Sequence, residues 1–264
     1  MTTSMLAPPR QAASGQFPLV PLVGAGQCVP LVQGGQSRYV NLDYAASAPA
    51  LQPVAERVTE LLQLYASVHR GAGYASQACT AAYEAARRDV ASFAGAGNGD
   101  VVIFTRNTTD ALNLLASATP GPVVHLDIEH HANLLPWQAR GGRVVLARAT
   151  LAGTLAALEA ELGRAPAALL SVTGECLPLP EIASLAHRHG ARVAVDGAQL
   201  VPHRRVDMRA IRADYLAFSG HKIYAPFGAG VLIGKRDWLD AAPPYLAGGG
   251  AVRHVTVESA WDHR

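Results

Sequence analysis

The sequence predicts an α/β protein with a mostly parallel sheet flanked by helices. Short apolar runs typical of buried strands recur along the chain, and helical stretches with one apolar face fall between several of them. This alternation is characteristic of parallel sheets, because neighbouring parallel strands need a crossover connection that is usually a helix. Half of the 264 residues are apolar, so the chain can bury a large core.

The strands and helices are expected in alternation beyond residue 50. Strands are predicted at 100–105, 122–128, 143–149, 167–172, 192–197, 215–219 and 230–234. Helices are predicted at 53–68, 81–95, 153–163 and 179–190. Ligands of such sheets bind in the crevice at the carboxyl ends of the strands. The polar residues that follow the strands are therefore the candidates for a functional site.

Charge and cysteine usage exclude several classes of partner. The 22 basic and 20 acidic residues give a net charge of +2 with no long run of either sign, so we expect neither a nucleic-acid nor a membrane partner. No apolar run approaches the roughly 20 residues that span a bilayer. Cys28, Cys79 and Cys176 are widely spaced, which predicts no disulfide framework and no zinc site. A reducing cytoplasm and a small-molecule or protein partner fit best.

The N-terminal segment 1–38 differs in composition from the rest of the chain. It is rich in Pro, Gly, Gln and Ser, and it lacks both the basic region and the unbroken apolar region of a signal peptide. We predict an irregular arm there, followed by one domain over 39–264.

The first candidate site segment is "TRNTTDALNLL", residues 105–115. Asn107, Thr108 and Thr109 follow a strand and open a helix, so free backbone N–H groups and two hydroxyls can cradle a phosphate. The alternative is an ordinary helix cap, with Asn107 or Thr108 as the N-cap and Asp110 in the first turn.

The second segment, "DIEHHANLLPW" at 127–137, carries two histidines after a strand. Nothing near His130 and His131 supplies further ligands at the spacing of known zinc sites, so no metal is expected. The alternatives are a ring that stacks on a flat cofactor and a histidine satisfied within the core.

Two further segments supply a carboxylate and an amine. Asp196 ends an apolar strand in "VAVDGAQLVPH", with Gln199 three residues later, and it is either a helix cap or an acid with a cationic partner. Lys222 lies in "FSGHKIYAPFGAGVLIGK", between glycines and a proline, where the chain turns tightly. A lysine that forms a Schiff base and an acid that keeps a pyridine nitrogen protonated are a known chemical pair.

Together these segments identify a resemblance. The stretches "YVNLDYAASAPA", "SVHRGAG", "RNTTDALN", "EHHANLLPW", "VDGAQLVPH" and "FSGHKIYAPFGAG" resemble the class V aminotransferase family, in particular its cysteine desulfurase and selenocysteine lyase branch. The resemblance runs from about Tyr39 to the end, and "SGHK" with "DGAQ" upstream is its most specific part. It implies the fold type I large domain with a seven-stranded sheet, the cofactor pyridoxal 5'-phosphate (PLP), an amino-acid substrate and a homodimer.

The resemblance also implies roles for the residues that contact the cofactor ring. Lys222 would form the Schiff base, Asp196 would pair with the pyridine nitrogen, and Gln199 would donate to the phenolate oxygen. The imidazole of His130 would stack on the ring and take part in catalysis.

Further roles follow for the phosphate and for the substrate entrance. Thr109 and the backbone of Thr108 would hold the phosphate, together with Ser219 and His221. The entrance would be lined by His69 and Arg70, from "SVHRGAG".

Three departures from the family pattern leave a second interpretation open, one of which is that none of Cys28, Cys79 and Cys176 matches the persulfide cysteine of the desulfurases. Family members continue into a C-terminal small domain that the sequence to Arg264 does not include, and they commonly carry a Ser-Asn-x-x-Gly segment where this chain passes from Gly174 to Glu175. The alternative is thus an inactive PLP-fold protein that serves as a cofactor-binding or dimerisation module. A nucleotide-binding protein is disfavoured, because neither G-x-x-x-x-G-K-[ST] nor G-x-G-x-x-G occurs after a strand.

Overall fold

A seven-stranded sheet forms the centre of the protein. The computed structural model describes residues 19–174, 177–246, 248, 252–254 and 262–263. The order of the strands is β3-β9-β8-β7-β6-β4-β5. They are β3 (Asp100–Thr105), β4 (Val123–Leu126), β5 (Arg143–Val145), β6 (Leu169–Thr173), β7 (Arg192–Asp196), β8 (Tyr215–Ser219) and β9 (Gly230–Lys235). All seven predicted strands are confirmed, although β4 and β5 are shorter than expected.

The sheet is mostly parallel, as predicted. β5, β4, β6, β7 and β8 run in one direction, whereas β9 is antiparallel to both β3 and β8. Thr173 pairs with Asp196 across β6 and β7, and Ser219 ends the adjacent strand β8. The carboxyl ends of these three strands therefore share one edge of the sheet, which is where the sequence predicts a site.

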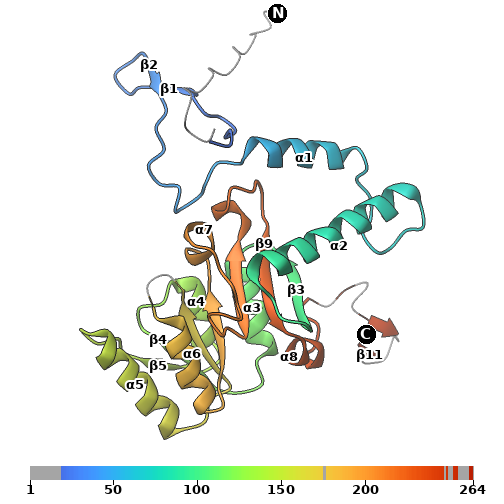
Figure 1. The fold of residues 1–264 in the computed structure, drawn as a ribbon. Coiled ribbons are helices and arrows are strands. Elements are labelled where there is room, and N and C mark those ends of the chain that lie inside the picture. Colours follow the sequence, from blue (N-terminus) through green and yellow to red (C-terminus); the bar gives the residue numbers. More distant parts are fainter. Residues whose placement is uncertain (1–18, 175–176, 247, 249–251, 255–261, 264) are drawn as a thin grey trace, which may run out of the picture.

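Helices cover both faces of the sheet (Figure 1). One apolar core contains side chains of α2 (Tyr74–Ala94), α5 (Leu151–Arg164) and α6 (Leu179–Arg188). The other contains side chains of α3 (Thr108–Ala118), α4 (His131–Gln138) and α8 (Arg236–Ala241). Val193 and Val195 of β7 face the first core and Ala194 faces the second, so this strand is buried on both sides.

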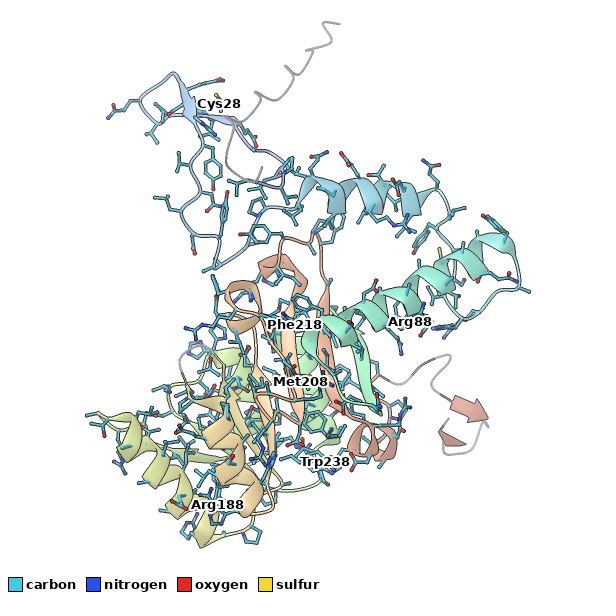
Figure 2. The ribbon with its side chains drawn as sticks, viewed as in Figure 1. Cys28, Arg88, Arg188, Met208, Phe218 and Trp238 are labelled. Atoms are coloured by element: carbon cyan, nitrogen blue, oxygen red, sulfur yellow. The ribbon has the colours of Figure 1, made fainter. Side chains whose placement is uncertain are left out.

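The N-terminal part projects away from the sheet (Figure 1). The arm predicted to be irregular contains a short antiparallel pair, β1 (Cys28–Pro30) with β2 (Gln36–Arg38), and α1 (Gln52–Leu62) follows. Met208 and Phe218 are almost fully buried inside the body, whereas Cys28 lies on the projecting hairpin (Figure 2). The arm is tied to the segment before α1, because the N–H of Val23 donates to the carbonyl of Ala50 at 2.9 Å and that of Gln52 donates to the carbonyl of Pro21 at 2.7 Å.

Helix α1 ends six residues earlier than expected, and the reason is tertiary. In the loop after α1, the carbonyl of Leu64 accepts a hydrogen bond from Cys79 Sγ at 2.8 Å, and the carbonyl of Ser67 accepts one from Ser76 Oγ at 2.5 Å. Both donors belong to α2, which begins at Tyr74 rather than at residue 81. A helix that continued to residue 68 would use the carbonyl of Leu64 within the helix, and here Cys79 holds it instead.

The remaining elements are short. They are α7 (Leu200–His203), the one-turn 3₁₀ helix η1 (Gly220–Lys222), β10 (Val252–His254) and β11 (Asp262–His263). Across the ranges described above, no helix combines the length and the hydropathy needed to cross a bilayer.

Candidate active site

A pocket of about 600 Å³ lies at the carboxyl edge of the sheet. It brings together all of the residues proposed to contact the cofactor: Thr108, Thr109, His130, Asp196, Gln199, Ser219, His221 and Lys222. Asn107, a candidate of the first segment, lines it as well, and so do residues that the sequence reasoning missed: Asp43, Ala45, Ala46, Ala132, Thr173 and Ala198. Asp43 and the two alanines come from the segment that precedes α1, which only long-range folding places at this edge.

The phosphate cradle predicted at the start of α3 is joined to the end of β8. The N–H of Thr108 donates to Ser219 Oγ at 2.8 Å, and the two hydroxyl oxygens are 2.6 Å apart. Asn107 is the N-cap of α3, because its side chain accepts from the N–H of Asp110 at 2.9 Å. The ordinary cap is therefore present, and it coexists with a helix N-terminus that faces the pocket.

Gly230 on β9 sets how closely the cradle approaches the sheet. A Cβ atom at Gly230 would lie 2.5 Å from the backbone N, Cα and C atoms of Asn107. A side chain there would have to displace the backbone that leads into α3.

We expect Gly230→Ala to lower the free energy of unfolding by about 1–3 kcal/mol, because backbone cannot yield as a flexible side chain can. Urea denaturation would measure the loss. Gly228→Ala is the matched control, since its new Cβ would meet only the carbonyl oxygen of Arg106, at 3.6 Å. Equal stability of the two variants would show that the cradle tolerates displacement.

Asp196 is a buried carboxylate that has a single short backbone partner. Its side chain is 4% exposed, and Oδ1 accepts from the N–H of Ala198 at 2.9 Å. Burial raises the pKa of Asp196, and the Ala198 N–H, His130 and Lys222 oppose that effect. A cation bound in this pocket would favour the charged carboxylate. The donor set therefore fits a protonated pyridine ring.

Lys222 lies in a loop with a strained backbone. It ends the turn η1 directly after β8, and Tyr224 and Phe227 both have a φ of +66°. Such conformations cost about 1–3 kcal/mol each, so neighbouring contacts must hold them. The N–H of Leu51 donates to the carbonyl of Tyr224 at 3.0 Å, and that of Ala48 donates to the carbonyl of His221 at 2.9 Å. The segment before α1 thus holds the lysine loop against the pocket.

His130 and Gln199 are also held by local partners. Nδ1 of His130 accepts from the N–H of Ala132 at 3.1 Å, so the imidazole caps α4 and the proton of the neutral ring is assigned to Nε2. The amide of Gln199 donates to the carbonyl of Ala45 at 2.9 Å. Each side chain is therefore oriented at the pocket wall without a ligand.

The structure does not bring His69 and Arg70 to this pocket. His69 lies in the loop between α1 and α2, with a φ of +59°, and its Nε2 is 2.9 Å from a carboxylate oxygen of Glu84. Its backbone N–H donates to Thr80 Oγ1 at 2.9 Å. These bonds tie the loop to α2, away from the residues that line the pocket, so the entrance role stays a prediction.

Glu129 is a buried acid beside the pocket that the sequence reasoning did not single out. It is 5% exposed and accepts a hydrogen bond from Asn133 Nδ2 at 2.6 Å. Burial raises its pKa to about 7, while hydrogen bonds from Asn133 and the backbone of Thr173 oppose the shift and the charge of Asp196 adds to it. The sequence did not predict its burial, because Glu129 is followed by His130 and His131 and the three polar residues show no apolar periodicity.

The raised pKa of Glu129 predicts a pH-dependent stability. The pKa of Glu129 in the folded protein lies above its ordinary value of 4.5. The protonated group therefore contributes to the free energy of unfolding in full below pH 4.5, and this contribution is lost as the pH rises through 7. The loss is about 3 kcal/mol at most. We expect Glu129→Gln to remove this pH dependence. Urea denaturation between pH 5 and pH 8 should therefore show a smaller decline in the free energy of unfolding of the variant than in that of wild type. Parallel declines would mean that the carboxyl group is charged throughout.

The sequence predicts that the site holds no metal and that a family segment is missing after Gly174. Within the described ranges, no group of three or more His, Cys, Asp or Glu side chains is arranged to hold a metal ion. The junction of Gly174 with Glu175, where the family segment is missing, lies outside the described residues on its C-terminal side, as does Cys176.

Comparisons with known proteins agree with this geometry. The profile of the family "Aminotransferase class-V" matches residues 40–263. A cysteine desulfurase of Dickeya dadantii is 42% identical over 235 residues, which cover 82% of this chain and 57% of the relative. A cysteine desulfurase of Haloferax volcanii is 42% identical over 244 residues, which cover 84% of this chain and 57% of the relative. The chain thus spans little more than half the length of these relatives.

Solved structures give the same result. The apo cysteine desulfurase from Thermococcus onnurineus NA1 superposes with a TM-score of 0.73 at 33% identity, covering 84% of this chain and 60% of that one. A cysteine desulfurase from Escherichia coli superposes with a TM-score of 0.70 at 34% identity, with the same coverage of 84% and 60%. The expected fold type I architecture is confirmed. On its sequence and its fold alike, the chain belongs to the class V aminotransferase family.

Proposed function

We propose that residues 39–264 form the large, cofactor-binding domain of a PLP-dependent enzyme that acts on an amino acid. The observation that carries the proposal is the convergence of Lys222, Asp196 and the Thr108–Ser219 pair on one pocket. When bound, PLP supplies a carbonyl carbon that bonds to amines and a pyridine ring that withdraws electrons from the substrate Cα. An amine, a buried acid and a helix N-terminus are the groups that such a cofactor needs.

Each residue has a separate task in this proposal. The N-terminus of α3, with Thr109, Ser219 and His221, binds the phosphate through N–H and side-chain donors. Asp196 holds the proton on the pyridine nitrogen, because a buried carboxylate is stabilised by an adjacent cation.

The remaining residues act at the ring and at the reacting carbon. Gln199 donates to the phenolate oxygen, and the imidazole of His130 covers the ring face and excludes water. Nζ of Lys222 holds the cofactor covalently and moves the proton at Cα of the substrate. Its position at the end of η1, directly after β8 and in the lining of the pocket, supports this role.

The relatives indicate which amino acid to test first. They are named cysteine desulfurases, so we propose cysteine as the substrate. We further propose a homodimer in the cytoplasm. Exposed large side chains such as Leu42 (92%) and Phe227 (81%) support an interface, and the free thiols of Cys28 and Cys79 in the described part support a reducing compartment. Since His69 and Arg70 do not line their own pocket, an entrance role for them would require the pocket of a second copy.

Titration of the purified chain with PLP tests the proposal. We expect an absorbance band near the visible edge, followed by exchange of the Cα proton of cysteine with D₂O, measured by NMR, and formation of sulfide and alanine. A panel of other amino acids would identify a different substrate. If the cofactor binds and no amino acid exchanges its Cα proton, the chain is a cofactor-binding or dimerisation module instead.

A further inference from the structure

A buried polar cluster lies behind the pocket wall that carries His130. It consists of Glu129, Asn133, Trp137 and Ser171, none of which lines the pocket itself. Asn133, Trp137 and Ser171 are fully buried and Glu129 is 5% exposed. Burying this many polar groups is costly unless each has a partner, so the arrangement of their hydrogen bonds is informative.

Asn133 is the centre of the cluster. Its amide nitrogen donates to Glu129 Oε2 at 2.6 Å, and its carbonyl oxygen accepts from Trp137 Nε1 at 2.9 Å and from Ser171 Oγ at 2.6 Å. The backbone N–H of Asn133 also donates to the carbonyl of His130 at 2.7 Å. The cluster therefore connects β6 to the first turn of α4, where His130 is the N-cap.

We propose that Glu129 is a positioning residue of the pocket, which acts in its uncharged form through Asn133 to hold the first turn of α4 and the His130 ring against β6. The inference rests on the proposed function, because positioning matters only if His130 faces a bound cofactor. Glu129 directly precedes His130 in the chain, and its side chain is hydrogen-bonded to Asn133, which follows His130 by three positions. The backbone that carries the ring is thus held by the bond between the residues on either side of it in the chain.

The surroundings of Glu129 favour the uncharged form. The groups that face it are the amide of Asn133 on α4, the backbone of Thr173 at the end of β6 and the carboxylate of Asp196 on β7. None of these is a cation, and Oε1 has no hydrogen-bond partner among the residues that the structure describes. The positive charge of Lys222 acts on Asp196 instead. Burial accordingly raises the pKa of Glu129.

Cofactor affinity in matched variants tests the positioning role. Glu129→Gln keeps the size and the neutral charge, so at about pH 6 we expect a dissociation constant for PLP within about twofold of wild type. Glu129→Ala breaks the bond to Asn133 and should weaken binding about tenfold. Glu159→Ala makes the same change on the exposed surface of α5 and should have no effect. Wild-type affinity in a folded Glu129→Ala variant would overturn the proposal.

The pH dependence tests the charge state. Wild type can gain a charge at position 129, whereas Glu129→Gln cannot. Any effect of pH on the cofactor itself is the same for both proteins, so it cancels when one dissociation constant is divided by the other. The ratio of the wild-type to the Glu129→Gln dissociation constant should therefore be steady near pH 6 and should change as the pH rises through about 7 to about 8. A constant ratio, or a Glu129→Gln variant as weak as Glu129→Ala at about pH 6, would overturn action in the uncharged form.

The His130 imidazole resonances in the chain without PLP separate this inference from the proposed function. They can be assigned with His130→Asn, and we expect them to keep their wild-type positions in Glu129→Gln and to shift in Glu129→Ala. Unshifted resonances in Glu129→Ala would overturn the positioning role whether or not PLP binds. Failure of wild type to bind PLP, with the expected shifts present, would instead overturn only the cofactor assignment.

Discussion

Lys222→Ala is expected to abolish covalent retention of PLP and all cofactor-dependent turnover. The variant removes the amine proposed to bond to the cofactor carbonyl, and no other group in the pocket is a primary amine. The free energy of unfolding should change by less than about 1 kcal/mol, because a half-buried site group is lost rather than core volume. Borohydride reduction followed by peptide mapping should place a phosphopyridoxyl group on Lys222 of wild type.

The chain supplies its own control for this experiment. Lys222 and Lys235 are its two lysines, and Lys235 ends β9, where its Nζ is 2.9 Å from a carboxylate oxygen of Asp100. Lys235→Ala should retain the cofactor and its label. Label on Lys235 of wild type, or retention of PLP by Lys222→Ala after reduction, would contradict the assignment.

Asp196→Asn is expected to slow exchange of the substrate Cα proton by roughly 100-fold or more. The change keeps the shape of the side chain and removes the charge proposed to hold the pyridine proton. Losing one partner of a buried ion pair costs about 3–5 kcal/mol, and each 1.36 kcal/mol is tenfold in rate. Exchange of bound cysteine in D₂O, followed by NMR, measures the effect, and PLP should bind more weakly.

Stability distinguishes this role from that of a structural cap. Because burial raises the pKa of Asp196, the stability that its protonated form contributes is present below its ordinary pKa of 3.8 and is lost as the pH rises through the folded value. At neutral pH without PLP, Asp196→Asn should therefore be at least as stable as wild type. Asp240→Asn, on the exposed helix α8, is the control. Unchanged exchange with lowered stability would make Asp196 only a cap for Ala198.

The sequence was sufficient for the order of the strands and for most of the candidate site. The runs 100–105 and 215–219 are strands with the predicted bounds, and 215–219 is buried along its whole length, as a continuous apolar run in the middle of a sheet is expected to be. Several candidate residues could be named because they end or follow a predicted strand and parallel strands end at one edge of the sheet, whereas Ser219 and His221 were implied by the family resemblance. The identity of the pocket residues from Thr108 to Lys222 is thus a local property of the sequence.

Local patterns failed where a distant segment decides the outcome. The end of α1 depends on Ser76 and Cys79 of α2, which bond to carbonyls of the loop after α1. The loop of His69 is likewise tied to Glu84 on the same helix, and the entrance role of His69 stays a prediction. Neither contact has a signature in the periodicity of the segment that it changes.

What the sequence determined by itself is which side chains are candidates for the site, and in what order they come: Thr108, His130, Asp196 and Lys222. Only the tertiary structure decided how they are held. The bond from Thr108 to Ser219 spans 111 positions, and that from Gln199 to Ala45 spans 154. Glu129 changes from an ordinary surface residue to a buried acid with a pKa of about 7 only when α4 packs on the sheet. The physical reason is that hydrophobic periodicity reports which face of an element is buried, whereas hydrogen bonds and pKa values depend on the few groups that folding brings within a few ångströms.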